Sequence, residues 1–151
     1  MDSQPKSKDF EKSVPTLTRR GALCALAVVT LGLIPKPAVA ASGVKVLKNG
    51  RVVLSLVTNR ALSKVGGVVQ IDNLNGRSIA LIRTGKGKKA FTALDLRCTH
   101  EGEIVAQQGA LWSCPRHGAT FDLAGALKIG PANTGLRKLR VRVKAKKVVI
   151  S

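Results

Sequence analysis

Short runs of apolar and β-branched residues recur along the chain from residue 44 onward, and none of them has helical spacing. These runs are VKVL (44–47), RVVLSLV (51–57), GGVVQI (66–71), SIALI (78–82), AFTALDL (90–96), LRKLRVRVKA (136–145) and KKVVI (146–150). Between them lie KNGR, NLNGR and TGKGKK, which are rich in the asparagine, glycine and lysine that suit tight hairpin turns. The pattern predicts an all-β fold, an antiparallel β-sandwich or small barrel.

The run near the C-terminus shows the alternation most clearly, because the segment RVRVKA (140–145) alternates cations with apolar residues. A strand with this period has one buried and one solvent-exposed face. No internal repeat or low-complexity tract accompanies these strands. We therefore predict a single β domain over residues 41–151.

The first forty residues have a different character and resemble an export signal. A polar stretch ends at Arg19-Arg20, and the apolar run that follows, Gly21–Ile34, is 14 residues long. A helix needs roughly 20 apolar residues to cross a bilayer, so this run is short for a membrane span. The sequence PKP then breaks the run, and the small residues of AVA suit a signal peptidase. We predict that residues 1–40 are a leader that is cleaved after Ala40.

The arginine pair resembles a twin-arginine signal, which exports folded proteins across the bacterial inner membrane. One departure is Ala22, where this type of signal usually has a large hydrophobic residue; Leu23 follows it. The resemblance implies a periplasmic protein. An uncleaved leader that anchors the domain to the inner membrane, facing the periplasm, is the alternative.

Candidate metal ligands are concentrated in two stretches, LRCTHEGE (96–103) and WSCPRHGATF (112–121). They contain both histidines of the chain and two of its three cysteines; the ligands are Cys98, His100, Cys114 and His117. The third cysteine, Cys24, belongs to the predicted leader. A disulfide is one explanation of the remaining pair, but it leaves the two neighbouring histidines unexplained. A structural zinc site usually draws two cysteines from one short loop, whereas here each loop supplies one cysteine and one histidine.

The spacing C-x-H, then 13 residues, then C-x-x-H resembles the Rieske [2Fe–2S] iron–sulfur family. CTHEG, CPRHGATFDLAGALKIGPA and LRKLRVRVKAKKVVI resemble its ligand loops, its glycine-proline loop and its terminal hairpin. The resemblance covers roughly residues 43–151. It implies a Rieske-type β-sandwich or barrel with a cluster-binding subdomain built from two loops.

The same resemblance implies the roles of the four ligands. Cys98 and Cys114 would bind the inner ferric ion as thiolates, and His100 and His117 would bind the outer iron through ring nitrogens. Thiolates donate strongly and keep their iron ferric, so the histidine-bound iron nearer solvent is the one that accepts the electron. Trp112 is a candidate shield for such a site.

Further residues around the ligands carry expectations of their own. Gly102 and Gly118 are expected to let the backbone pass close to the cluster and point amide hydrogens at its sulfurs. The alternative is that they are ordinary turn glycines. Glu103 and Arg116 occupy the places where relatives of the cytochrome bc type have two further cysteines, joined in a disulfide. We hypothesise a salt bridge between Glu103 and Arg116 in its place.

Two other departures concern the redox potential. High-potential relatives have a serine and a tyrosine hydroxyl where this chain has Ala119 and Phe121. Hydroxyls that donate to sulfur stabilise the more negative, reduced cluster. The resemblance therefore implies a potential below that of the quinol-oxidising proteins.

The function that follows is one-electron transfer, by a free carrier or by a small subunit of an oxidoreductase complex. An oxygenase needs a second iron held by two histidines and a carboxylate, and both histidines here are already assigned. The chain is therefore expected to have no substrate site of its own. The alternative function is a zinc-stabilised β-sheet binding module without redox activity.

Charge bears on the partners. The net charge is +18, and without the leader the chain has 20 Lys and Arg against 5 Asp and Glu, or +15. Such a field favours an acidic redox donor or acceptor, a large catalytic subunit or anionic lipid heads; basic strand faces that only aid solubility explain it equally well. Nucleic acid is not expected, because export and the scarcity of stacking aromatics argue against it. Membrane association is expected only if the leader is retained.

Overall fold

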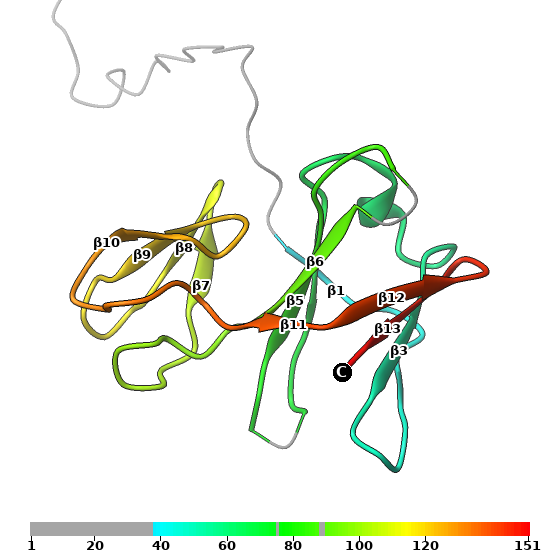
Figure 1. The fold of residues 1–151 in the computed structure, drawn as a ribbon, viewed down its shortest axis with the longest axis horizontal. Helices are drawn as coiled ribbons and strands as arrows, with labels where there is room; N and C mark the ends of the chain where they lie inside the picture. The colour runs from blue at the N-terminus through cyan, green and yellow to red at the C-terminus, as the bar shows by residue number, and fades with distance from the viewer. Residues whose placement is uncertain (1–37, 75, 88–89) are drawn as a thin grey trace, which may run out of the picture. The chain divides into compact units, whose positions relative to one another are not determined.

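The computed structural model describes residues 38–74, 76–87 and 90–151, and these form three β-sheets and one 3-10 turn, η1 (Arg60–Ser63) (Figure 1). The predicted leader lies outside the described residues except for its last three, 38–40. Among the described residues no helix has the length and apolar character needed to cross a membrane.

The central sheet has the order β1-β4-β5-β6-β11. Its strands are β1 (Val39–Ala40), β4 (Val68–Ile71), β5 (Ile79–Arg83), β6 (Phe91–Asp95) and β11 (Lys138–Leu139). The other pairs in this sheet are antiparallel, but β1 runs parallel to β4. Cleavage after Ala40 would remove this short strand and leave the β4–β5–β6 meander intact.

A second sheet, the ligand-loop sheet, has the order β10-β9-β8-β7. Its strands are β7 (Ala106–Gln108), β8 (Leu111–Ser113), β9 (Thr120–Asp122) and β10 (Leu127–Ile129). The third, the C-terminal sheet, has the order β12-β13-β3-β2. Its strands are β12 (Val141–Lys144), β13 (Lys147–Ile150), β3 (Val52–Ser55) and β2 (Lys45–Val46).

The central sheet is buried on both faces, and this makes the domain three layers deep. On β5, Ala80 and Ile82 pack into one core, while Ile79 and Leu81 pack into the other. Successive side chains of a strand point to opposite faces, so the two cores lie on opposite sides of the sheet. The first core contains residues of the ligand-loop sheet, and the second contains residues of the C-terminal sheet. The two outer sheets therefore lie on either side of the central one (Figure 1).

The predicted all-β class is confirmed, and each of the seven predicted runs contains a strand. Two differences are informative. The run 136–145 is divided at Arg140, because the chain leaves the central sheet after β11 and enters the C-terminal sheet as β12. The strands β7 to β10, with the sequences AQQ, LWS, TFD and LKI, were not predicted, since none of them lies in a β-branched or alternating run. The strand β1 was not predicted because it lies in the predicted leader.

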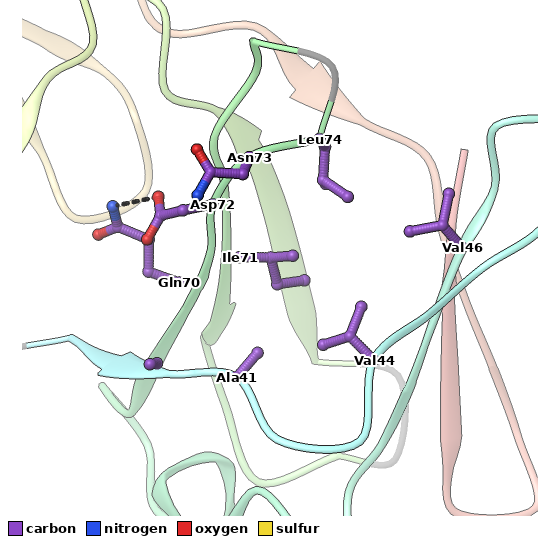
Figure 2. A pocket seen from close by; sticks show the side chains of 9 residues that line it. Ala41, Val44, Val46, Gln70, Ile71, Asp72, Asn73 and Leu74 are labelled. Atoms are coloured by element: carbon purple, nitrogen blue, oxygen red, sulfur yellow. Dashed lines mark hydrogen bonds between the residues drawn. The ribbon is translucent and has the colours of Figure 1, made fainter.

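A shallow pocket of about 410 Å³ lies between the segment 40–46 and the residues 70–74 of β4 and the turn after it. Ile71, Val44 and Val46 line it, and the amide of Gln70 donates to Asp72 beside it at 2.9 Å (Figure 2). Its lining contains no cysteine or histidine. This pocket is therefore separate from the predicted metal ligands.

One buried carboxylate joins the central sheet to the first ligand stretch. Asp95, at the end of β6, is 1% exposed and accepts hydrogen bonds from the guanidinium groups of Arg77 and Arg97, each at 2.8 Å. The backbone amide of Arg97 donates to the same carboxylate at 3.2 Å. Burial alone would raise the pKa of Asp95, but the bonds from Arg97 and Arg77 outweigh it and lower the pKa from 3.8 to about 2. The carboxylate thereby holds the backbone just before Cys98.

We expect Asp95→Asn to lower the free energy of unfolding by about 2 kcal/mol at pH 7, as the pKa shift implies. Because the folded-state pKa lies below the unfolded value, this stabilisation is present above about pH 4 and is lost as the pH falls toward 2. Urea unfolding of wild type and variant measures it. The difference in free energy of unfolding between wild type and Asp95→Asn should shrink as the pH falls from 4 to 2. Asp72→Asn, at an exposed position, serves as the control and should not show this decrease. A constant difference across this pH range would contradict the account.

Candidate metal centre

The two ligand stretches form the same turn. Loop 1 (98–103) and loop 2 (114–119) each begin with the cysteine, and the amide of the cysteine donates to the carbonyl of the last loop residue, at 2.7 Å and 2.8 Å. The amides of Gly102 and Gly118, four residues after the cysteines, donate back to the cysteine carbonyls at 2.8 Å and 3.0 Å. The two loops therefore form the same turn, although their motifs differ. The histidine is the third residue of the turn in loop 1 (C-x-H-x-G) and the fourth in loop 2 (C-x-x-H-G).

Both turns depend on the backbone conformation of their glycine. Gly102 has φ +80° and Gly118 has φ +73°, a left-handed conformation that L side chains rarely adopt. A Cβ at either position would meet no heavy atom within 4 Å, so conformation and not space requires glycine. Both residues are thus turn glycines, and their own amides donate to the cysteine carbonyls and not to sulfur.

Other amides of the same loops reach the sulfurs. The thiol of Cys98 accepts from the amides of His100 and Glu101, and the thiol of Cys114 accepts from those of Arg116 and His117. These are the second and third residues after each cysteine. Which amides donate to the sulfurs could not be predicted from the sequence, because it depends on how the turn closes and not on residue type.

The two thiols are buried and lie within hydrogen-bonding contact of each other. Cys98 is 3% and Cys114 is 2% exposed, and they do not form a disulfide. Burial raises the pKa of the Cys98 thiol, and the neighbouring Cys114 raises it further. Burial would raise the pKa of Cys114 too, but the amides of its own loop and the Cys98 thiol, which donate to it, lower that pKa. Cys114 is therefore the thiol of the pair that holds negative charge more readily.

The two histidines meet at the surface outside the cysteines. The Nδ1 atoms of His100 and His117 are 3.2 Å apart, and the ring planes are nearly perpendicular at 88°. Both residues are exposed. The structure therefore pairs the two cysteines in the interior and the two histidines at the surface. The potential ligand atoms of His100, His117 and Glu101 all lie within 4.8 Å of one another, and this carboxylate was not among the ligands predicted from the sequence.

A carboxylate and a guanidinium also link the two loops. Glu101 lies 3.8 Å from the Nε of Arg116 and 3.7 Å from the Nε2 of His117. The hypothesised pair of Arg116 with Glu103 was wrong. Glu103 lies where loop 1 returns toward the bridge between Arg97 and Ile104, whereas Glu101 is inside the turn, facing loop 2.

A third segment, residues 130–135, is tied to loop 1. The hydroxyl of Thr99 donates to the carbonyl of Thr134 at 2.6 Å. Thr99 is exposed, and this contact could not be predicted from the sequence. Ala132 of the same segment packs into the core that contains both cysteines. The glycine-proline loop therefore forms part of the wall beside the ligands.

Trp112 lies in the same core and is fully buried. Its indole Nε1 donates to the carbonyl of Leu123 at 3.2 Å, which anchors the ring between β8 and the residue after β9. Together with Phe121, it excludes water from the side of the cysteines that faces the interior. This position supports the expected shielding role.

The donor set can be tested against a [2Fe–2S] cluster on chemical grounds. A cluster of the Rieske type needs two thiolates on one iron and two imidazoles on the other. The loops supply two buried sulfurs surrounded by amide donors and two Nδ1 atoms that face each other. The residues present fit this group.

Comparison with known proteins gives the same family. The family described as "Rieske [2Fe-2S] domain" matches residues 56–140, which are more than half of the chain. The iron-sulfur subunit of the cytochrome b6-f complex of Chlorobaculum thiosulfatiphilum is 29% identical over 98 residues, which are 64% of this chain and 52% of that protein. The chain thus spans about half the length of this relative.

Solved structures of Rieske proteins are similar as well. The plasma membrane Rieske protein PetC3 of Synechocystis PCC 6803 is 24% identical with a TM-score of 0.48, over 56% of this chain and 86% of that one. The ferredoxin of carbazole 1,9a-dioxygenase from Nocardioides aromaticivorans IC177 is 20% identical with a TM-score of 0.45, over 66% and 93%. The family match over residues 56–140 shows that this chain belongs to the Rieske [2Fe-2S] domain family, whose cofactor is the [2Fe–2S] cluster and whose function is electron transfer.

Proposed function

We propose that this chain is a periplasmic one-electron carrier, free or as the small subunit of an oxidoreductase complex, and that Cys98, Cys114, His100 and His117 hold its cluster. The observation that carries the proposal is the pair of matching turns, each with one buried thiol and one exposed imidazole. Cys98 and Cys114 would hold one iron as thiolates, and His100 and His117 would hold the other through their Nδ1 atoms, which lie 3.2 Å apart.

When bound, the cluster supplies one-electron redox chemistry. The chain supports it through its own groups. Amides of both loops donate to the cysteine sulfurs and offset the negative charge that arrives with the electron. Trp112 and the rest of the core keep water from the sulfur side, while the exposed imidazoles give a redox partner access to the other side.

The location and the partners follow from the leader and the charge. The twin-arginine-like pair Arg19-Arg20 suits a protein that receives its cluster in the cytoplasm and is exported folded. The excess of cations favours an acidic redox donor or acceptor. Since both histidines serve the cluster, a substrate would be transformed on another chain. A retained leader would place the domain at the periplasmic side of the inner membrane.

Metal analysis and visible spectroscopy of purified protein test the ligand assignment. We expect two irons per chain in wild type and loss of both in Cys98→Ser, Cys114→Ser, His100→Ala and His117→Ala. Cys24→Ser is the matched control and should retain the cluster, because Cys24 belongs to the leader. Zinc in place of iron, or full iron in any of the four ligand variants, would contradict the proposal.

We expect added hydroxyls to raise the redox potential. Ala119 and Phe121 are fully buried in the core of the cysteines, and a hydroxyl that donates to sulfur there stabilises the reduced state. Ala119→Ser and Phe121→Tyr should each raise the potential by about 50–100 mV, given the strength of such a bond. Redox titration measures the shift. Phe91→Tyr, a buried phenylalanine of the other core, is the control and should leave the potential unchanged.

The ion pair between the loops is expected to make a small contribution, because Arg116 and Glu101 are 60% and 45% exposed. A double-mutant cycle with Glu101→Gln and Arg116→Gln should give a coupling energy of about 0.2–1 kcal/mol that disappears at high salt. Urea unfolding supplies the four free energies. In the same cycle with Glu103→Gln, the effects of the two substitutions on the free energy of unfolding should simply add. Coupling of Arg116 to Glu103 in place of Glu101 would contradict the described geometry.

A further inference from the structure

The outer face of the C-terminal sheet is strongly basic. Register places alternate residues of β12, β13, β3 and β2 on one side, and the residues on the other side pack into the second core. We call the outer side the basic face. Its cations, including those next to the strand ends, are Arg140, Arg142, Lys144, Lys147, Arg51 and Lys45, and all of them are exposed.

No acidic residue balances these cations. The four strands, all of which the structure describes, contain no aspartate or glutamate. None of the ion pairs in the described part of the chain involves a residue of the basic face. The positive charges therefore stand together on one face without a counterion from the protein.

An aliphatic strip runs between the cations. Val149 pairs with Val53 across the strands, and both are half-buried in the middle of the face. Leu47, 43% exposed, joins them beside Arg51, to whose carbonyl its amide donates at 2.8 Å. The face thus combines a ring of cations with a narrow apolar centre.

The basic face and the ligand loops belong to different outer layers, with the central sheet between them. The ligand-loop sheet packs on one side of the central sheet, and the C-terminal sheet packs on the other (Figure 1). A surface that covers the basic face therefore leaves His100 and His117 free. This separates the face from the place where a redox partner would approach the imidazoles.

We propose that the basic face binds the anionic lipid headgroups of a membrane surface. Protein interfaces favour aromatic residues and are depleted in lysine at their core. Here the four described strands contain no aromatic residue, and three of the six cations are lysines. Clusters of four to eight Lys and Arg are typical of sites that bind anionic lipids, and exposed aliphatic residues add contact with the interface.

The proposal goes beyond the redox role and does not depend on the cluster. It departs from the expectation that membrane association requires a retained leader, because the basic face would contact lipid by itself. Bound in this way, the domain would lie on the membrane with its ligand loops directed away from the lipid. Its histidines would remain available to a partner.

Sedimentation of the full chain with phosphatidylcholine vesicles, with and without phosphatidylglycerol, tests the proposal. We expect binding only to the vesicles that contain phosphatidylglycerol, and weaker binding as salt is raised. Each cation near such a surface strengthens binding roughly fivefold, so Arg142→Gln/Lys144→Gln/Lys147→Gln should weaken it roughly tenfold or more. Arg142→Gln alone should have a smaller effect in the same direction.

The matched control is Arg60→Gln/Lys64→Gln/Lys86→Gln, which removes one exposed arginine and two exposed lysines from outside the basic face. It should bind like wild type, although its net charge equals that of the first triple variant. Far-UV circular dichroism should show that both variants are folded, and the leader is present in all of them.

Equal binding by wild type and the first triple variant would overturn the proposal, and so would an equal loss in both triple variants. Failure of wild type to bind the anionic vesicles would overturn it as well. If the chain were then retained on immobilised polyglutamate and the first triple variant were not, the face would bind an acidic protein. Iron content, measured on the same samples, recognises failure of the redox proposal separately.

Discussion

The ligand site depends on one backbone constraint, a turn closed in the same way in both loops. The amide of the residue four positions after each cysteine donates to the cysteine carbonyl, at 2.8 Å in loop 1 and 3.0 Å in loop 2. This closure requires the left-handed backbone of Gly102 and Gly118. It directs each sulfur into the core beneath two amides and leaves the histidine of the loop at the surface. Burial of sulfur and exposure of imidazole are thus consequences of the turn.

The rest of the domain holds these two turns in place. Loop 1 leaves the central sheet next to Asp95, which is fixed by Arg77 and Arg97, and loop 2 connects β8 to β9 of the ligand-loop sheet. A central sheet buried on both faces supports both outer sheets. This three-layer order separates the imidazole end from the basic face. Electron exchange and the proposed membrane attachment would use opposite sides of one small domain.

Much of this structure could be predicted from the sequence, for physical reasons that differ between its parts. The strands β2 to β6 and β11 to β13 lie within β-branched or alternating runs, so their existence was predictable, whereas β1 lies in the predicted leader and was not predicted. The four residues Cys98, His100, Cys114 and His117 stood out because cysteine and histidine are rare in this chain. The break of the last run at Arg140 was not predictable, since a change of sheet alters neither hydrophobic period nor composition.

Contacts that depend on how the turns close could not be predicted from the sequence. The amides of His100 and Arg116 reach sulfur because of their position in the turn, and any residue type would supply the same N–H. Arg116 pairs with Glu101 and not with Glu103 for the same reason. The two glutamates differ only in their position along the loop, and the closed turn decides which of them faces Arg116. Thr99 likewise gained its partner from a segment 35 residues away in the sequence.

The two histidines are proposed to bind the iron that accepts the electron. Electron–nuclear double resonance on reduced protein, with ¹⁵N introduced only into histidine, is the measurement to make. We expect hyperfine coupling to two histidine nitrogens in wild type, those of His100 and His117. A paramagnetic cluster without coupling to histidine nitrogen would contradict this proposal.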